Sequence, residues 1–276
     1  MVHTITLVWS FRNRFDIFKK SILTADKTCP KYVNFCLVDG ASDESTIRKL
    51  RIFCNSIKNR KIRICESAYR STVSEAWNLG IMLSDSRYVV FISSDVEFKN
   101  RQWIKDLLRM IDAGYEYVLI DNHAVFMIDK RIIPRLGWLD ERFELGPHFD
   151  TDYMIRASEE KVRFIILKNR NSYTHYDSPK MTAARRKGEV KDRLPMHGSA
   201  NENYFKLKWQ SSWPGWKDRI HPPGNIKEVK RILAEIDPHP FFTKKINKIH
   251  GNESMKKITL AGVKRIPIKI SQRLDK

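Results

Sequence analysis

Short apolar runs alternate with segments of helical spacing through the first hundred residues. The apolar runs are rich in β-branched and aromatic residues and predict strands at 4–9, 32–38, 62–64 and 88–92. Between them, apolar residues recur every three or four positions, which predicts helices at 16–27, 44–57 and 72–83. This order of strand and helix predicts a parallel sheet with helices on both faces.

The pattern changes after about residue 101. A helix built around Trp103 is followed by two strands, a helix through Arg156 and a further strand; the three strands are expected at 117–120, 123–129 and 164–167. The fold class predicted for the whole is therefore α/β, with a mixed, mostly parallel central sheet. Residues 176–199 are polar and basic and predict a mobile loop, and 201–210 and 226–236 have helical spacing.

The charge of the chain narrows the choice of partners. Lys and Arg outnumber Asp and Glu by 51 to 32, giving a formal net charge of +19. Such an excess indicates an anionic partner: nucleotide phosphates, nucleic acid, an acidic glycan or a membrane surface. The segment from residue 226 onward carries 13 Lys/Arg and 5 Asp/Glu, so a peripheral contact of this tail with anionic lipid is one hypothesis and a solvated basic surface is the other.

The cellular location of the protein is inferred from its apolar segments and its cysteines. The run at 4–9 is too short to span a bilayer, lacks the features of a signal peptide, and no later segment is apolar over a spanning length. The four cysteines have neither metal-binding spacing nor disulfide-scaffold density; they are Cys29, Cys36, Cys54 and Cys65. They are expected to be reduced thiols in a cytoplasmic protein.

Candidate ligand-binding residues follow the predicted strands. Ser10 and Arg12 follow the first strand, Asp39 the second, and Asp95 the fourth. Ligands of parallel α/β sheets bind at the carboxyl ends of the strands, so these positions predict a nucleotide-type ligand. Arg12 and Arg14 have guanidinium groups suited to phosphates, although surface arginines are an equally simple interpretation.

Two acidic segments suggest catalytic chemistry. Asp95 and Glu97, beside Ser94, could hold a divalent cation such as Mg²⁺ or Mn²⁺, or could be solvated acids at a strand end. Asp150 and Asp152 precede a helical segment, where an acid could serve as a general base or as a simple helix cap.

His175 follows a strand and opens the predicted basic loop. Its imidazole could supply a nitrogen ligand to the cation, or it could be an ordinary loop histidine.

Seven segments resemble, in order, motifs of the inverting glycosyltransferases of the GT-A fold, the family-two-like group and its β-1,4-galactosyltransferase relatives. They are Phe-Arg-Asn-Arg within 10–14, Val-Asp-Gly-Ala-Ser-Asp at 38–43, Ala-Trp-Asn-Leu-Gly-Ile at 76–81, the segment 91–97 around the D-x-D region, Gly-Trp-Leu-Asp-Glu-Arg-Phe at 137–143, the segment 149–156 and His175. Together they cover residues 4–210.

The resemblance implies a role for each matched residue. The donor nucleotide, most readily a uridine diphosphate sugar, would be bound by Ser10, Arg12, Arg14, Asp39, Asn78, Ser94 and Asp95. Mn²⁺ (or Mg²⁺) would be held by Asp95, Glu97 and His175. Asp150 aligns with the catalytic base of the family, with Asp152 the second catalytic candidate.

Two departures from the family pattern stand out. In one alignment Ser93 replaces the first acid of the D-x-D motif and Asp95 is the lone carboxylate; in the other Asp95 is the first acid and Glu97 the second. Both alignments stay open at this point. Phe149 replaces the glutamate that usually precedes the base.

The resemblance implies a metal-dependent, inverting transfer of a sugar to a hydroxyl of a glycan, lipid-linked or protein-linked acceptor. A glycosyltransferase domain is expected over residues 1–212, with a nucleotide-binding half at 1–100 and an acceptor half at 101–212, followed by a basic extension at 213–276. A non-catalytic sugar-nucleotide or glycan-binding module is the alternative. A nucleic-acid-binding protein is disfavoured because no known recognition signature is present. A nucleotidyltransferase is disfavoured because its Gly-rich, Lys-containing loop is missing.

Overall fold

The computed structural model describes residues 3–67, 71–120, 122–141, 143, 148–169, 171–176 and 205, and the backbone of 246–251. Apart from Tyr176 and Phe205, the predicted loop at 176–199 and the predicted helices at 201–210 and 226–236 lie outside these residues. The same holds for most of the basic extension.

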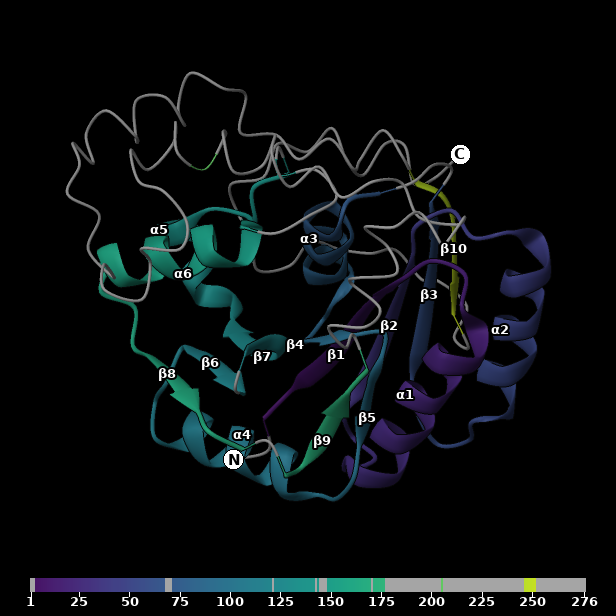
Figure 1. Cartoon of the computed structure of the whole chain (residues 1–276), viewed down its shortest axis with the longest axis horizontal. Helices are drawn as coiled ribbons and strands as arrows, with labels where there is room; N and C mark the ends of the chain where they lie inside the picture. The colour runs from purple at the N-terminus through teal and green to yellow at the C-terminus, as the bar shows by residue number, and fades with distance from the viewer. Residues whose placement is uncertain are drawn as a thin grey trace.

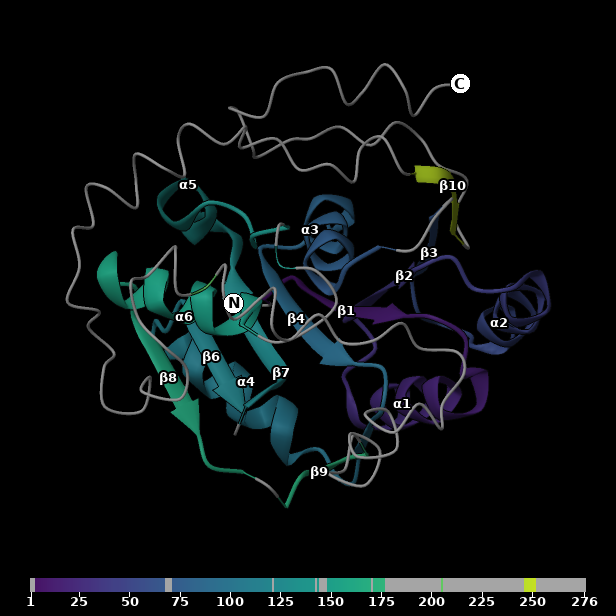
Figure 2. The same ribbon diagram turned by 45° about the horizontal axis from the view of Figure 1, so that its top comes forward.

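The described part of the chain contains ten strands. In chain order they are β1 (Ile5–Phe11), β2 (Asn34–Asp39), β3 (Ile62–Ser67), β4 (Tyr88–Ser93), β5 (Val96–Phe98), β6 (Tyr117–Ile120), β7 (Asn122–Asp129), β8 (Phe164–Leu167), β9 (Tyr173–His175) and β10 (Ile246–Gly251). Eight of them form the central sheet in the order β10-β3-β2-β1-β4-β7-β6-β8, and β5 pairs with β9 in a small second sheet (Figures 1 and 2).

The central sheet is mixed and mostly parallel, as predicted. Strands β3, β2, β1 and β4 are mutually parallel, and β8 runs parallel to β6. Strand β7 is antiparallel to both of its neighbours, and β10, from the predicted extension, is antiparallel to β3. The reversal at β7 matters for function because it brings the start of β7 to the edge at which β4 ends.

Helices cover both faces of the sheet (Figure 1). One face packs against α1 (Phe15–Thr28), α2 (Glu44–Ser56) and α4 (Gln102–Asp112). The opposite face packs against α3 (Val73–Leu83), α5 (Ile133–Leu136), which follows the short 3₁₀ turn Lys130–Ile132, and α6 (Phe149–Glu159). The strand residues alternate between these two cores, so the apolar run of β4 is buried on both sides.

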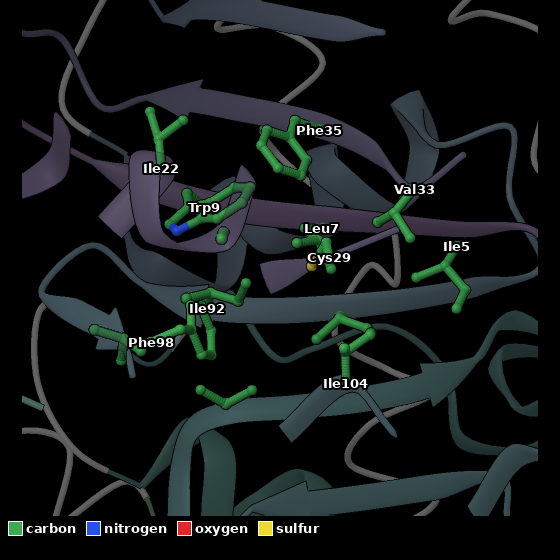
Figure 3. Packing of buried hydrophobic residues seen from close by; sticks show 14 of the residues in the cluster. Ile5, Leu7, Trp9, Ile22, Cys29, Val33, Phe35, Ile92, Phe98 and Ile104 are labelled. Atoms are coloured by element: carbon green, nitrogen blue, oxygen red, sulfur yellow. The ribbon is translucent and has the colours of Figure 1, made fainter. Parts of the chain in front are cut away.

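Close packing on the α1 side is seen around Trp9 (Figure 3). Its ring lies edge-on to Phe35, with centroids 4.9 Å apart, and its indole N–H donates to Ser21 Oγ at 3.0 Å. A buried tryptophan normally needs such a partner for its N–H. The four cysteines are unpaired and buried, in keeping with the prediction of free thiols.

Helix α3 lies unusually close to β1 at Gly80. A Cβ atom placed on Gly80 would come within 2.2 Å of Val8 Cγ1. The helix is fixed in this position at its start by a capping box, in which Thr72 Oγ1 accepts from Glu75 N at 3.1 Å and Glu75 Oε2 accepts from Thr72 N at 2.6 Å. The missing side chain at Gly80 therefore sets the distance between α3 and the sheet.

The main differences from prediction are at strand ends and in short strands. β3 extends to Ser67, three residues beyond the predicted strand, and β1 and β4 also continue past their predicted ends. The three-residue strands β5 and β9 were not predicted, because so short a run has no recognisable alternation. None of the helices in the described part of the chain combines the length and hydropathy needed to span a bilayer.

Candidate active site

The carboxyl ends of β1, β2 and β4 meet at one edge of the sheet. Ser10 pairs with Val38 of β2 and with Ser93 of β4, and Phe11 pairs with Asp39. The residues predicted to bind a nucleotide after these three strands are therefore neighbours in space, at the position where parallel sheets bind ligands.

The loops after β1 and β2 are joined by hydrogen bonds. Asn13 N donates to Ser42 Oγ at 2.7 Å, Asp43 N donates to Asn13 Oδ1 at 3.0 Å, and Arg12 Nε donates to Ala41 O at 3.3 Å. Three separate bonds between two short loops make them a single unit. This unit forms one wall of the candidate nucleoside site.

Three non-glycine residues of these loops have left-handed backbone conformations. The φ angles are 52° at Asn13, 55° at Arg14 and 63° at Ala41. Such conformations cost roughly 1–2 kcal/mol per residue for L-amino acids other than glycine. Strained backbone of this kind concentrates at functional sites, where the surrounding contacts maintain it.

Asp39 is buried at the base of this wall, and both of its carboxylate oxygens accept from Ser42 N at 3.0 Å. Burial raises the pKa of Asp39, and the nearby charge of Glu66 adds to this, while the bonds from Ser42 oppose it. The carboxylate thus organises the loop that follows β2. Arg12 is exposed, and Ser10, Arg14 and Ser94 are half-buried.

Asp95 and His175 form the first acidic centre of the site. The pairing of β5 with β9 sets Val96 opposite His175, and His175 Nε2 lies 3.2 Å from Asp95 Oδ1. Tyr176 N also donates to Asp95 O at 3.1 Å. Burial by itself raises the pKa of Asp95, but the hydrogen bond and charge of His175 and the charge of Arg14 outweigh it and leave the pKa below its usual value.

Glu97, the third predicted metal ligand, is not part of this pair. It stands opposite Thr174 in the small sheet, and its Oε2 accepts from Tyr176 Oη at 2.8 Å. Among the residues that the structure describes, no three His, Cys, Asp or Glu side chains converge as metal ligands.

Asp150 forms the second acidic centre, at the second residue of α6. Its Oδ1 accepts from Thr151 N at 2.8 Å, and its Oδ2 lies 3.2 Å from His123 Nδ1. The other ring nitrogen of His123, Nε2, lies 2.9 Å from Tyr117 Oη. The Asp150 side chain keeps 28% of its surface exposed, so it remains open to a ligand while being held on two sides.

The two acidic centres lie at the same edge of the sheet, next to the ends of the neighbouring strands β4 and β7. Ile92 of β4 pairs with Val125 of β7. Because these strands are antiparallel, Asp95 and His123 both lie beyond this pair in the same direction, one following β4 and the other near the start of β7. His123 in turn contacts Asp150. The two acids predicted from separate motifs are thus held at one place.

Asp152, the second predicted catalytic candidate, has a different environment from Asp150. Its side chain has no exposed surface, and Oδ2 accepts from Arg156 Nε at 3.0 Å and Nη2 at 2.8 Å. Arg156 Nη1 donates to Leu136 O at 2.6 Å and Trp138 O at 2.8 Å. This buried ion pair ties α6 to the segment after α5, and an acid so enclosed cannot reach an acceptor hydroxyl.

Asn78 is likewise a structural residue and not a nucleotide ligand in this conformation. It is fully buried in α3; its Nδ2 donates to Leu139 O at 2.9 Å and Glu141 Oε1 at 2.8 Å, and its Oδ1 accepts from Leu139 N at 3.0 Å. Both amide protons are used, so no donor is left for a nucleotide. Asn78 instead holds the 137–141 segment against α3.

The sequence interpretation missed His123, Tyr117 and Tyr176. His123 stands in an otherwise apolar stretch, Ala-Val-Phe-Met-Ile, near the start of a strand that was correctly predicted. The available signal was a single polar residue at the end of a buried strand, close to the sheet edge that carried the other candidates.

Residues 6–189 match the family described as Glycosyl transferase family 2. The chain belongs to this family. The match covers more than half of the 276 residues and includes both acidic centres. The prediction of a GT-A glycosyltransferase is confirmed at this level, whereas nothing found here extends it to the β-1,4-galactosyltransferases. No curated protein matches the chain.

Solved glycosyltransferases share the fold of this family 2 chain. The mannosyltransferase PcManGT from Pyrobaculum calidifontis, in complex with GDP-Man and Mn²⁺, is 12% identical, with a TM-score of 0.63 over 87% of this chain and 77% of that one. S. aureus TarS 1-349 in complex with UDP-GlcNAc is 14% identical, with a TM-score of 0.58 over 87% and 73%. The chain covers only 42% of the longer TarS structure.

Proposed function

We propose that this family 2 chain is a metal-dependent, inverting glycosyltransferase that moves a sugar from a nucleoside diphosphate to a hydroxyl of a glycan, lipid-linked or protein-linked acceptor. The observation that carries the proposal is that Asp95, which follows β4, and Asp150, which contacts His123 near the start of β7, lie at the same edge of the sheet. Asp95 helps to hold the cation that neutralises the leaving diphosphate, and Asp150 takes the proton of the acceptor hydroxyl.

The joined loops after β1 and β2 bind the nucleoside half of the donor. Their fixed backbone provides a preformed wall, so little conformational entropy is lost on binding. The half-buried Ser10 and exposed Arg12 are candidates for the diphosphate, and Arg14 supplies positive charge close to Asp95. A uridine diphosphate sugar is the first donor to test.

Asp95 and His175 fit a divalent cation such as Mn²⁺. They offer one hard oxygen and one imidazole nitrogen, 3.2 Å apart and carried on paired strands. Two protein ligands suffice where substrate phosphate oxygens complete the coordination, a common arrangement for Mg²⁺. Such a cation, when bound, neutralises charge on the departing diphosphate. Glu97 contributes through Tyr176 and not as a ligand.

Asp150 acts as the general base. Its partly exposed carboxylate takes the proton of the acceptor hydroxyl while that oxygen bonds to the anomeric carbon, and the bond to the diphosphate breaks with its electron pair leaving on the nucleotide. A single displacement inverts the configuration at that carbon.

The first experiment is a screen of nucleoside diphosphate sugars with and without Mn²⁺, read as thermal stabilisation of the protein and as release of nucleoside diphosphate. The proposal expects one donor to stabilise the chain only with the metal and to be turned over with an acceptor. Product analysis by NMR then reports the anomeric configuration. Stabilisation without any release of nucleotide would support the non-catalytic binding module instead.

The cellular location of the protein and the contact of its basic tail with a membrane are part of the same proposal. The chain is proposed to act in the cytoplasm, with the basic tail as the candidate contact to an anionic membrane that carries its acceptor. Co-sedimentation with vesicles of anionic and of neutral lipid tests the contact. Equal binding to both vesicle types, or none to either, would contradict it.

A further inference from the structure

We infer that His123 is a positioning residue for the base: it is held by Tyr117 as the tautomer that carries its proton on Nδ1, and it uses that proton to orient the carboxylate of Asp150. The inference rests on the proposed function and extends it to two residues outside the recognised motifs. The contacts are His123 Nδ1 to Asp150 Oδ2 at 3.2 Å and His123 Nε2 to Tyr117 Oη at 2.9 Å.

The tautomer follows from the chemistry of Tyr117. Its ring is fully buried among Phe126, Tyr153 and Phe164. Burial, and then the nearby charge of Asp150, raise the pKa of Tyr117 well above its usual value, so the phenol keeps its proton. A phenol oxygen can donate or accept, but the carboxylate of Asp150 can only accept, so the ring nitrogen facing it, Nδ1, carries the proton and the phenol O–H donates to Nε2. Nε2 of His123 is then the acceptor, and the single proton of a neutral ring must be on Nδ1.

The surroundings keep His123 neutral. Burial lowers the pKa of His123, and the charge of Asp150 opposes this without cancelling it. In the part of the chain that the structure describes, the charged and titratable groups that act on the pair are Asp150 from α6, Tyr117 from β6, and, beyond Tyr117, Tyr153 and Arg156 from α6. Arg156 is already bound to Asp152 and to two carbonyl oxygens, so its charge is largely balanced.

A neutral donor suits a general base better than a cationic one. An imidazolium beside Asp150 would stabilise the carboxylate and reduce its tendency to accept a proton. A neutral N–H directs Oδ2 with a weaker effect on basicity. Together with Thr151 N on Oδ1, it fixes the plane of the carboxylate and leaves its exposed side for the acceptor. In the reaction the acceptor proton moves to Asp150, and His123 keeps its own proton throughout.

Two substitutions at His123 separate orientation from mere packing. An asparagine amide nitrogen lies three bonds from Cα, like Nδ1, whereas a glutamine amide nitrogen lies four bonds away, like Nε2. His123→Asn therefore keeps a donor toward Asp150, and His123→Gln loses it. We expect kcat of His123→Gln to fall about 10–100-fold, the range known for partners that orient a functional group, with the donor KM unchanged. His123→Asn should keep most of its turnover.

A spectroscopic measurement tests the tautomer directly. The ¹⁵N chemical shifts of a histidine ring distinguish a protonated from an unprotonated nitrogen. We expect Nδ1 of His123 to be protonated and Nε2 unprotonated in the resting protein, and Tyr117→Phe to change this pattern while leaving Asp150 in place. A ring protonated on Nε2 in the wild-type protein would overturn the inference. Tyr117→Phe also serves as the kinetic variant, with reduced kcat, if His123→Gln does not fold.

The outcomes distinguish this inference from the proposed function. Wild-type transfer together with His123→Gln at the wild-type kcat would overturn the role of His123 and leave the glycosyltransferase proposal intact. Failure of the wild-type chain to release nucleotide from any donor would remove the proposed function and, with it, the role of His123 as a partner of the base. A selective loss of kcat in His123→Gln that does not occur in His123→Asn supports both the proposed function and the role of His123.

Discussion

Asp95 Oδ1 lies 3.2 Å from His175 Nε2, although the two residues are 80 positions apart in the sequence. The pairing of β5 with β9 produces this contact, since it sets His175 opposite the residue after Asp95. The oxygen and the nitrogen, carried on paired strands, would supply two of the ligands of a six-coordinate cation. The nucleotide diphosphate is proposed to provide the rest.

Loss of either donor atom should remove the metal dependence of donor binding. We expect Asp95→Asn to lose the stabilisation by nucleoside diphosphate and Mn²⁺, because an amide oxygen is a weaker ligand for a hard cation than a carboxylate. Glu97→Gln is the matched control, since Glu97 is bound by Tyr176 and not by His175. Thermal shift titrations measure both. An equal loss in Glu97→Gln would return Glu97 to the set of ligands.

Removal of the Asp152 charge should reduce the stability of the folded protein much more than removal of the Asp150 charge. Asp152→Asn leaves the buried Arg156 without its charge partner and should cost about 3–5 kcal/mol in the free energy of unfolding. Asp150→Asn leaves the Arg156 pair intact and should cost much less. Urea denaturation of the two variants measures the difference. Equal stability of both variants would contradict the structural role given to Asp152.

The sequence was sufficient to predict most of the fold. The apolar run of β4 is buried on both faces, and amphipathic segments between the strands could be identified as helices, so the parallel half of the sheet was predictable. The short β5 and β9 were not, because a strand of three residues has no periodicity to detect. Strand β10, within the predicted extension, was missed for a related reason: it lies in a segment of irregular pattern.

The site was predictable only in part. The positions of Asp39, Asp95 and Asp150 followed from strand ends and a helix start. The partners of each acid could not be predicted, because they depend on contacts between distant segments: His175 reaches Asp95 through β9, and His123 reaches Asp150 from β7. Motif similarity likewise could not show that Asn78 and Asp152 are buried and fully engaged.

Gly80 should tolerate no larger residue. Gly80→Ala places a methyl group about where Val8 Cγ1 already stands, so α3 or β1 must shift. Overpacking of this kind costs about 1–3 kcal/mol, which outweighs the gain in helix propensity from alanine. Denaturant unfolding measures the loss. An unchanged or increased stability would contradict the close approach of α3 to β1.

The stability of the chain should depend on pH through His123. Burial lowers the pKa of His123 in the folded protein, while in the unfolded chain it titrates near 6.5. Below that pH the unfolded state takes up a proton that the folded state resists, so stability falls as pH falls. The loss is absent above about pH 7.

His123→Asn should remove this part of the acid sensitivity. The difference between wild type and His123→Asn in the free energy of unfolding, followed from about pH 7.5 down to about pH 5.5, isolates the contribution. We expect the wild-type protein to lose more stability over this interval than the variant. Parallel curves would show that His123 titrates with its ordinary pKa.

The central claim is that Asp150 takes the proton of the acceptor hydroxyl while that hydroxyl attacks the anomeric carbon of a sugar donor bound at Asp95. Single-turnover transfer by Asp150→Asn, at saturating donor and Mn²⁺, tests it most directly. The account predicts unchanged donor affinity and a rate about 10²–10⁴-fold below wild type, the usual contribution of a general base. A rate within a few-fold of wild type, with the protein folded and donor bound, would contradict it.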